Sequence, residues 1–189
     1  NDSYGNYKIF EWISSGGFTA NWSIKIDPLS SIMLVVVTFV SALVHIYSIG
    51  YMSHDPHKPR FMSYLSLFTF SMLALVVSDN FLQLFFGWEG VGLCSYLLIG
   101  FWYKKETANN AAIKAFIVNR IGDFGLAIAI FLIFFFFGTI NFEETFQVTS
   151  QFAEKKIIFL GFEVNLITLI CVFLFIGAMG KSAQFLLHT

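Results

Sequence analysis

Charged residues are scarce in this sequence of 189 residues, because only 12% are Asp, Glu, Lys or Arg. A soluble domain carries about 25% charged residues, so the low value argues against a water-soluble globular fold. Apolar residues make up 57% of the chain, and they form long runs rather than stripes, with a mean hydropathy of +0.72. This combination is typical of an all-α membrane protein whose chain crosses the bilayer several times.

Basic charge and metal-binding motifs are also lacking. The formal net charge is −1, which argues against a nucleic-acid partner. Cys94 and Cys171 lie in apolar runs without CxxC or Cys/His spacing, so we expect no metal or iron–sulfur site in this chain. No signal-peptide pattern follows Asn1, and the last residues stop within an apolar run, so we expect a piece of a longer membrane protein.

Residues 1–28 are polar and aromatic, and we expect them to form an extramembrane segment. The stretch "FTANWSIKID" alternates like a short strand, and "SSGG" before it suits a hairpin turn. Asp27 and Pro28 then predict a helix start, because Asp is a good cap and Pro is tolerated in the first turn.

Five apolar segments follow, each near the roughly 20 residues that a helix needs to cross the hydrocarbon core. They are expected at about residues 29–52, 61–78, 80–102, 111–138 and 163–189. The sequence therefore predicts one transmembrane domain over residues 29–189, a bundle of about five helices with the last one truncated. Its surface loop, residues 139–162, contains a predicted short helix with Asn141 as cap and Glu144 three residues later.

Lysine and arginine residues indicate the orientation of these spans. One set of short flanks carries Lys58, Arg60, Lys104, Lys105 and Lys114. The opposite, longer segments are rich in acids and carry Lys8, Lys25, Lys155 and Lys156. We therefore expect the first set to face the cytoplasm or matrix. Residues 1–28 and the loop 139–162 are expected to face the periplasm or intermembrane space.

Ionisable groups inside the apolar segments are the candidate functional residues, since each costs about 2.5–3.5 kcal/mol near mid-membrane on insertion scales. Glu89 is one, and no residue within four positions can pair with it. Gly87, Gly90 and Gly92 surround it and allow a neighbouring helix or water to approach. A proton or ion site is the preferred interpretation, and a structural hydrogen bond is the alternative.

Lys181 is the second candidate, because it follows a long apolar run. Gln184 and His188 come three and seven residues later, which predicts that all three lie on one helical face. Such a polar stripe suits a proton relay. The alternative is a buried lysine paired for stability alone.

Structural interpretations are preferred for two other polar features. Arg120 and Asp123 are three residues apart, and we expect the pair to fix helix position; alternatively, Asp123 modulates the charge of Glu89. His45 lies on a face with three hydroxyl side chains, for which hydrogen bonding between helices is preferred over a water-lined path. These hydroxyl residues are Thr38, Ser41 and Ser48.

Five motifs carry a family resemblance: "IDPLSSIM", "VHIYSIGYM", "GWEGVGLCSYLLIGFW", "KAFIVNRIGDFG" and "GKSAQF". They resemble the subunit 5 family of respiratory complex I, the proton-translocating NADH:ubiquinone oxidoreductase, and the resemblance covers residues 20–189. The "GWEGVGLCSYLLIGFW" motif is the specific one, because the sister subunits 2 and 4 and the Mrp-type cation/proton antiporters keep the glutamate in different surroundings.

The resemblance implies roles for individual residues. Glu89 would pair across helices with Lys181, with Asp123 as a nearby modulating acid. The last helix would be broken, from about Phe185 to Thr189. In the implied mechanism, Glu89 alternately holds and releases the charge of Lys181, and the proton then passes along Gln184, His188 and water.

The resemblance also implies a proton-translocating subunit that couples quinone reduction to proton transport in the bacterial or mitochondrial inner membrane. The chain has no Gly-rich dinucleotide loop or flavin motif, so this chain would bind no cofactor. NADH, FMN, iron–sulfur clusters and ubiquinone would be bound elsewhere in the complex. The implied partners are other membrane subunits, with the antiporter-like subunit 4 as neighbour, the lipid bilayer and protons.

Two other functions stay open at this point. One is an Mrp-type sodium/proton antiporter subunit, which has no redox partner. The other is a structural membrane spacer, in which Glu89 and Lys181 are only a clasp.

Overall fold

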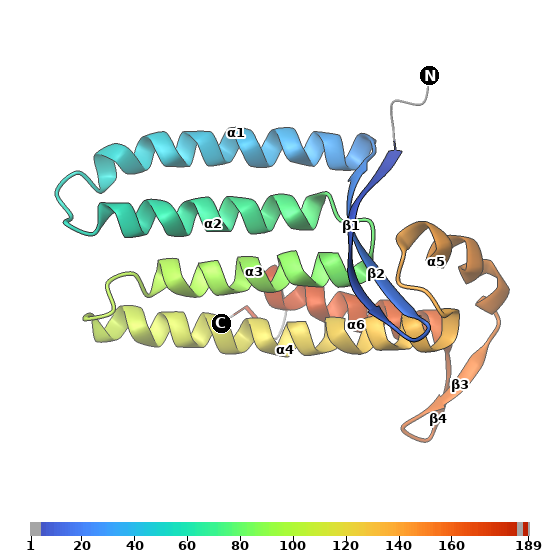
Figure 1. The fold of residues 1–189 in the computed structure, drawn as a ribbon. Helices are drawn as coiled ribbons and strands as arrows, with labels where there is room; N and C mark the ends of the chain where they lie inside the picture. The colour runs from blue at the N-terminus through green and yellow to red at the C-terminus, as the bar shows by residue number, and fades with distance from the viewer. Residues whose placement is uncertain (1–4, 185–186, 189) are drawn as a thin grey trace.

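The computed structural model describes residues 5–184 and 187–188. In Figure 1 the four longest helices lie side by side in a row, and a shorter helix packs against the last of them. The helices are α1 (Pro28–Tyr51), α2 (Lys58–Val76), α3 (Phe81–Ile99), α4 (Glu106–Phe137), α5 (Phe142–Thr149), the 3-10 turn η1 (Ser150–Phe152) and α6 (Leu166–Lys181). The strands are β1 (Gly5–Ser15), β2 (Phe18–Ile26), β3 (Lys156–Phe159) and β4 (Phe162–Asn165).

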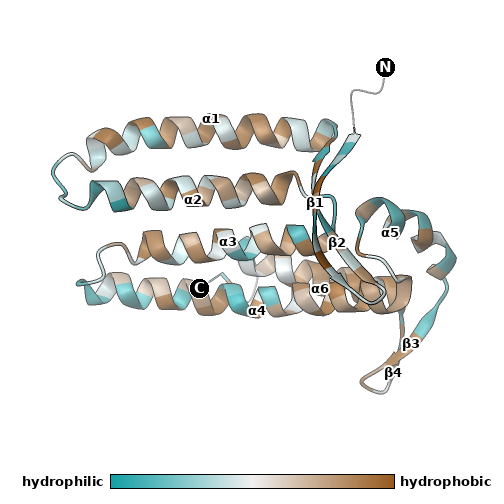
Figure 2. Ribbon diagram, viewed as in Figure 1, coloured by the Kyte–Doolittle hydropathy of each residue, from teal (hydrophilic) through white to brown (hydrophobic). Residues whose placement is uncertain are grey.

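Four described helices, α1 to α4, are long and apolar enough to cross a membrane. Hydrophobic residues predominate along these helices (Figure 2). The prediction of an all-α membrane bundle with a short N-terminal β segment is thus confirmed. The fifth span, predicted for residues 163–189, is wrong at both ends, because its first residues form β4 and its helix, α6, has only 16 residues.

Helix α6 ends at Lys181, before the predicted break at Phe185. Ala183 adopts a left-handed conformation with φ 49°, and the Gln184 N–H donates to the Met179 carbonyl over 3.3 Å. This bond across the helix end is typical of a Schellman motif, which normally uses glycine at the left-handed position. Phe185 itself lies outside the described residues, as does Thr189.

The early end of α6 also overturns the predicted polar stripe. Gln184 and His188 follow the helix in irregular chain and are exposed. They therefore do not continue the helical face of Lys181, and the prediction of one shared face is wrong. At 1.5 Å per residue α6 is about 24 Å long, and it ends near the middle of the neighbouring helices (Figure 1).

The N-terminal strands pair in an antiparallel hairpin that crosses the ends of the helices (Figure 1). Gln83 of α3 is fully buried and bonds to the backbone of Ser23 in both directions, accepting over 3.0 Å and donating over 2.8 Å. Asp27 caps α1 by accepting from the Ser30 N–H over 2.7 Å. That N–H lowers the pKa of the Asp27 carboxyl. The predicted strand, turn and cap are confirmed.

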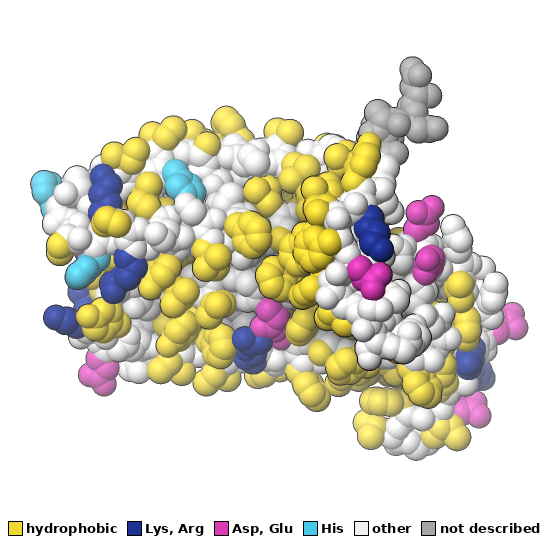
Figure 3. All heavy atoms as spheres, in the orientation of Figure 1, with side chains coloured by type: hydrophobic (Ala, Val, Ile, Leu, Met, Phe, Trp, Pro, Cys, Tyr) yellow, Lys and Arg dark blue, Asp and Glu magenta, His cyan; other side chains and the backbone are white. Residues whose placement is uncertain are grey.

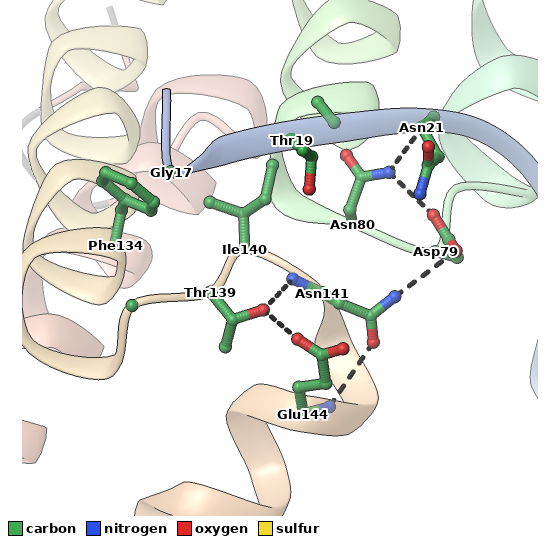
Figure 4. Close-up of a pocket in the computed structure, with 12 residues that line it drawn as sticks. Gly17, Thr19, Asn21, Asp79, Asn80, Phe134, Thr139, Ile140, Asn141 and Glu144 are labelled. Carbon is green, nitrogen blue, oxygen red and sulfur yellow. Dashed lines mark hydrogen bonds between the residues drawn. The ribbon is translucent and has the colours of Figure 1, made fainter. Parts of the chain in front are cut away.

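The loop after α4 packs at the same end of the bundle as this hairpin. Phe142 N–H donates to the Asp79 carbonyl and Phe81 N–H to the Ile140 carbonyl, each over 3.0 Å. A polar cavity of about 160 Å³ lies at this junction (Figure 4). Asn141 caps α5 as predicted. The β3–β4 hairpin that follows α5 was not predicted.

Helices α4 and α6 approach one another through glycines. A Cβ on Gly122 would lie 3.0 Å from the Gly180 Cα, so the two backbones are almost in contact. Between this crossing and the hairpin end of the bundle, a hydrophobic core connects α3, α4 and α6. Its fully buried members are Phe81, Leu126, Ile130, Ile133, Leu166 and Ile170. This packing holds the end of α6 at a fixed level beside α3 and α4.

Candidate functional site

Four charged side chains from three helices meet where α6 ends. Glu89 comes from the middle of α3, Arg120 and Asp123 from the middle of α4, and Lys181 is the last residue of α6. We call these four residues the charge network. Successive members lie within 4.0 Å in the order Glu89, Arg120, Asp123, Lys181.

Arg120 links the two carboxylates. Its Nη1 donates to Glu89 Oε2 and lies 3.8 Å from Asp123 Oδ2. Its Cζ atom lies 4.6 Å from the centroid of the Phe116 ring, a cation–π distance. Arg120 is the most exposed member, with 46% of its side chain accessible, whereas Glu89 is 22% accessible.

Asp123 lies at the centre of the network. Its side chain is only 6% exposed. Trp88 Nε1 donates to its Oδ1 over 2.8 Å, and the Lys181 Nζ lies 3.9 Å from the same oxygen. With Arg120 on its other oxygen, Asp123 is in contact with three positive or donor groups from three helices.

Lys181 is held less firmly than the other members. Its Nζ is buried and has no hydrogen-bond partner among the described residues. The Trp88 ring centroid lies 5.7 Å from Nζ. An ammonium has three donors, and buried donors are normally satisfied. Lys181 is therefore the member that has most to gain from a new partner.

Gly92 leaves the space that the Lys181 ammonium occupies. A Cβ at Gly92 would lie 2.6 Å from Nζ, and no other atom outside the adjacent residues and the backbone of α3 itself would come within 4 Å of it. The lysine thus extends from the end of α6 to the surface of α3, one helical turn beyond Glu89.

We predict that Gly92→Ala in the full-length protein displaces the Lys181 ammonium while the fold persists, because the clash involves only the tip of a flexible side chain. The reactivity of the Lys181 amine towards an amine-modifying reagent should change several-fold, and the melting temperature should change by only a few degrees. The matched control is Gly50→Ala, where a new Cβ meets nothing within 4 Å. Equal reactivity of Lys181 in both variants would contradict its position beside Gly92.

The structure brings together four of the predicted site residues. The expected pair of Arg120 and Asp123 is present, with 3.8 Å between Nη1 and Oδ2, but the other two ion pairs of the network within 4.0 Å join Glu89 to Arg120 and Lys181 to Asp123. Glu89 and Lys181 form no direct pair, because Arg120 occupies the Glu89 carboxylate. Trp88 was not predicted as a site residue, although its indole N–H directly precedes Glu89 in the sequence and could have indicated a donor to a buried carboxylate.

His45 contacts a different pair of helices. Its Nδ1 lies 2.8 Å from the Ser41 carbonyl oxygen and its Nε2 lies 3.4 Å from Ser66 Oγ on α2. Ser41 Oγ and Thr69 Oγ1, 2.7 Å apart, add a second link between α1 and α2. These contacts support the preferred interpretation of His45 as a link between helices.

The charges of the network sum to zero, since it contains two acids and two bases. This balance lowers the cost of placing four ionised groups inside an apolar bundle, because each charge has a neighbour of opposite sign. Arginine keeps its proton in proteins, so proton exchange is open to Glu89, Asp123 and Lys181. The arrangement therefore suits the movement of charge from one pair to another.

Comparison with known families gives two matches. Residues 78–189 match the family model described as "NADH:quinone oxidoreductase/Mrp antiporter, TM". Residues 12–62 match the model described as "NADH-Ubiquinone oxidoreductase (complex I), chain 5 N-terminus".

Individual relatives agree with these matches. The chain is 58% identical over 181 residues to "NADH-ubiquinone oxidoreductase chain 5" of Chondrus crispus, covering 96% of this chain and 27% of the relative. It is 57% identical over 181 residues to "NADH-quinone oxidoreductase subunit L" of Rickettsia bellii, covering 96% and 28%. The chain therefore spans little more than a quarter of the length of these curated relatives.

Solved structures share the fold. The Mrp complex from Dietzia sp. DQ12-45-1b superposes with a TM-score of 0.78 at 24% identity, covering 98% of this chain and 19% of that chain. A membrane-bound sulfane sulfur reductase, described as an archaeal respiratory membrane complex, gives 0.70 at 18% identity, covering 97% and 26%. The family model over residues 78–189, more than half of the chain, shows that this chain belongs to the membrane family shared by NADH:quinone oxidoreductase and the Mrp antiporters.

Proposed function

We propose that this chain is part of a chain-5-type subunit of NADH:quinone oxidoreductase. In this part of the subunit, a proton is transferred between buried charged side chains. The observation that carries the proposal is the charge network at the end of α6. The names of relatives at 57–58% identity support the redox-linked function over a stand-alone antiporter.

The early end of α6 supports transport rather than a purely structural role. Irregular backbone at membrane depth is tolerated where it is buried in protein or lines a water-filled cavity. Helix ends at this depth also mark ion sites in transporters. Lys181 is the last residue of α6, so its side chain and the last backbone groups of the helix share one location.

In the proposed mechanism, the Glu89 carboxylate has two alternative partners. When Glu89 binds Arg120, as in this structure, Lys181 keeps only the long contact to Asp123 and can pass its proton on to water. When Arg120 moves towards Asp123, Glu89 becomes available to hold a protonated Lys181. The step transfers a proton from the ammonium to water and leaves a neutral amine.

The redox cofactors are proposed to lie in other subunits of the complex. Arg120 supports the need for further protein, since 46% of its side chain is accessible at a level where the helices face hydrocarbon. A charge exposed to lipid is costly, so we propose that another part of the full-length subunit or a neighbour covers this face. An antiporter-like subunit such as subunit 4 is the proposed neighbour.

The test uses the full-length subunit in the assembled complex, reconstituted in liposomes. Lys181→Met should abolish most acidification driven by NADH while NADH oxidation by an uncoupled assay persists. Sodium should be dispensable for the wild-type acidification. Loss of activity only when sodium is removed would favour the Mrp-type alternative, and unchanged pumping by Lys181→Met would favour the structural spacer.

We predict that the two ends of the bundle face opposite sides of the membrane, with the α1–α2 loop towards the cytoplasm or matrix. In a Cys171→Ser background, a cysteine at His57 should react with a membrane-impermeant thiol reagent only from that side. A cysteine at Gln151 should react only from the opposite side. Both positions are exposed, whereas Cys94 is buried. Labelling of both from one side would overturn this topology.

A further inference from the structure

A cavity of about 380 Å³ opens at the end of the bundle opposite the hairpin, between the start of α2, the end of α3 and α4. Its lining is partly basic and aromatic and partly aliphatic. The residues that matter here are Arg60, Tyr64, Tyr96, Phe101, Tyr103 and Ile113. The cavity therefore lies where the apolar helices meet the polar loops.

Arg60 is the charged side chain that lines this cavity. Its Nη2 donates to the Phe101 carbonyl over 3.1 Å, and its Cζ lies 4.6 Å from the Phe101 ring centroid and 5.4 Å from that of Tyr103. No carboxylate of the described residues lies within 4.0 Å of it, and its buried Nε has no partner there. The guanidinium thus has no anionic partner among the described residues, and its donors form a fork that suits a phosphate or carboxylate.

The nearest acid does not supply the missing anion. Asp55 accepts from the His57 N–H over 2.7 Å and from Trp102 Nε1 over 3.0 Å. The His57 N–H lowers the pKa of the Asp55 carboxyl, and Arg60 makes a smaller contribution. Asp55 is therefore ionised but already engaged with other donors.

The surroundings reinforce the positive character of this end. Basic side chains gather there, around the ends of α1 to α4 (Figure 3). Trp102 and Tyr103 are 37% and 55% exposed next to the cavity, as expected for aromatic residues at a membrane interface. Basic pockets between membrane helices on the cytoplasmic or matrix side are suited to anionic lipid head groups.

We propose that this cavity binds the phosphate of an anionic phospholipid, with Arg60 as the phosphate-binding residue and Ile113 beside the acyl chain. A lipid fits better than free phosphate because half of the Ile113 side chain is exposed on the outward wall. The inference does not rest on the proposed transport function, since it concerns the other end of the helices.

The experiment measures lipid retention by the delipidated full-length subunit, using native mass spectrometry with dioleoylphosphatidylglycerol as the probe. Arg60→Gln should weaken the first phosphatidylglycerol adduct about tenfold, which corresponds to about 1.4 kcal/mol. The lipid affinity of Arg60→Lys should lie between those of the wild type and Arg60→Gln, because lysine keeps the charge but lacks the forked donors of arginine. Lys104→Gln is the control, since it removes the same charge from an exposed position outside the cavity.

Three results would overturn the proposal. If phosphatidylcholine is retained as well as phosphatidylglycerol, the cavity is only an apolar groove. If inorganic phosphate displaces the lipid, the cavity is a site for the free anion. Equal effects of Arg60→Gln and Lys104→Gln would place the lipid elsewhere. Should Arg60→Gln fail to fold, Ile113→Glu provides the test, because it places a negative charge on the exposed wall and should also weaken the phosphatidylglycerol adduct.

Discussion

Glu89→Gln in the full-length protein is expected to lower the protons pumped per NADH at least about tenfold, by analogy with the loss of one positioned proton-transfer group. Glutamine keeps the size and hydrogen-bonding capacity of the side chain but loses the charge that binds Arg120. The complex should still assemble, because Arg120 retains Asp123 as a counter-ion 3.8 Å away.

The control for this prediction is Glu89→Asp, which keeps the charge and should retain more pumping than Glu89→Gln. Pumping is measured as acidification of liposomes that contain the reconstituted complex, per NADH oxidised. A Glu89→Gln variant that pumps like the wild type would show that the carboxylate in "GWEG" serves packing.

Asp123→Asn is expected to have the largest effect on stability. Asparagine can still accept the Trp88 indole hydrogen bond, so the substitution removes the charge and little else. Lys181 then has no carboxylate within 4.0 Å among the described residues, and stranding a buried charge costs about 3–5 kcal/mol. We expect the amount of assembled complex and its melting temperature to fall.

A second substitution distinguishes stranded charge from lost packing. Asp123→Asn combined with Lys181→Met should restore much of the assembly, because the stranded ammonium is gone, but should not restore pumping. Asp55→Asn is the matched control for the loss of one hydrogen-bonded carboxylate outside the charge network. If the double variant assembles no better than Asp123→Asn alone, the ion pair with Lys181 is not what the complex loses.

Local signals in the sequence were enough for much of the fold. Long apolar runs predicted four of the spans, and Asp27 and Asn141 predicted the starts of α1 and α5 because capping depends on a single side chain. The end of α6 was not predictable in the same way. It depends on a left-handed Ala183, where local preference would favour glycine.

The site was predictable in composition and in the pair of Arg120 and Asp123 along one helix, but not in the pairs between helices. Buried charges in apolar sequence identified Glu89, Arg120, Asp123 and Lys181. The choice of partners depends on how three helices rotate and how closely α4 and α6 approach through Gly122 and Gly180. Sequence spacing along one helix carries no information about those distances.

The most direct test of the charge network is a double-mutant cycle on pumping, with Glu89→Gln, Lys181→Met and the two combined. If the four charges act as one unit, each single substitution already breaks the transfer, and the combined variant should pump about as well as the worse single one, since the effects of coupled residues do not add. Protons pumped per NADH would be measured for all four proteins at matched assembly. Strict additivity of the two effects would contradict a shared network between α3 and the end of α6.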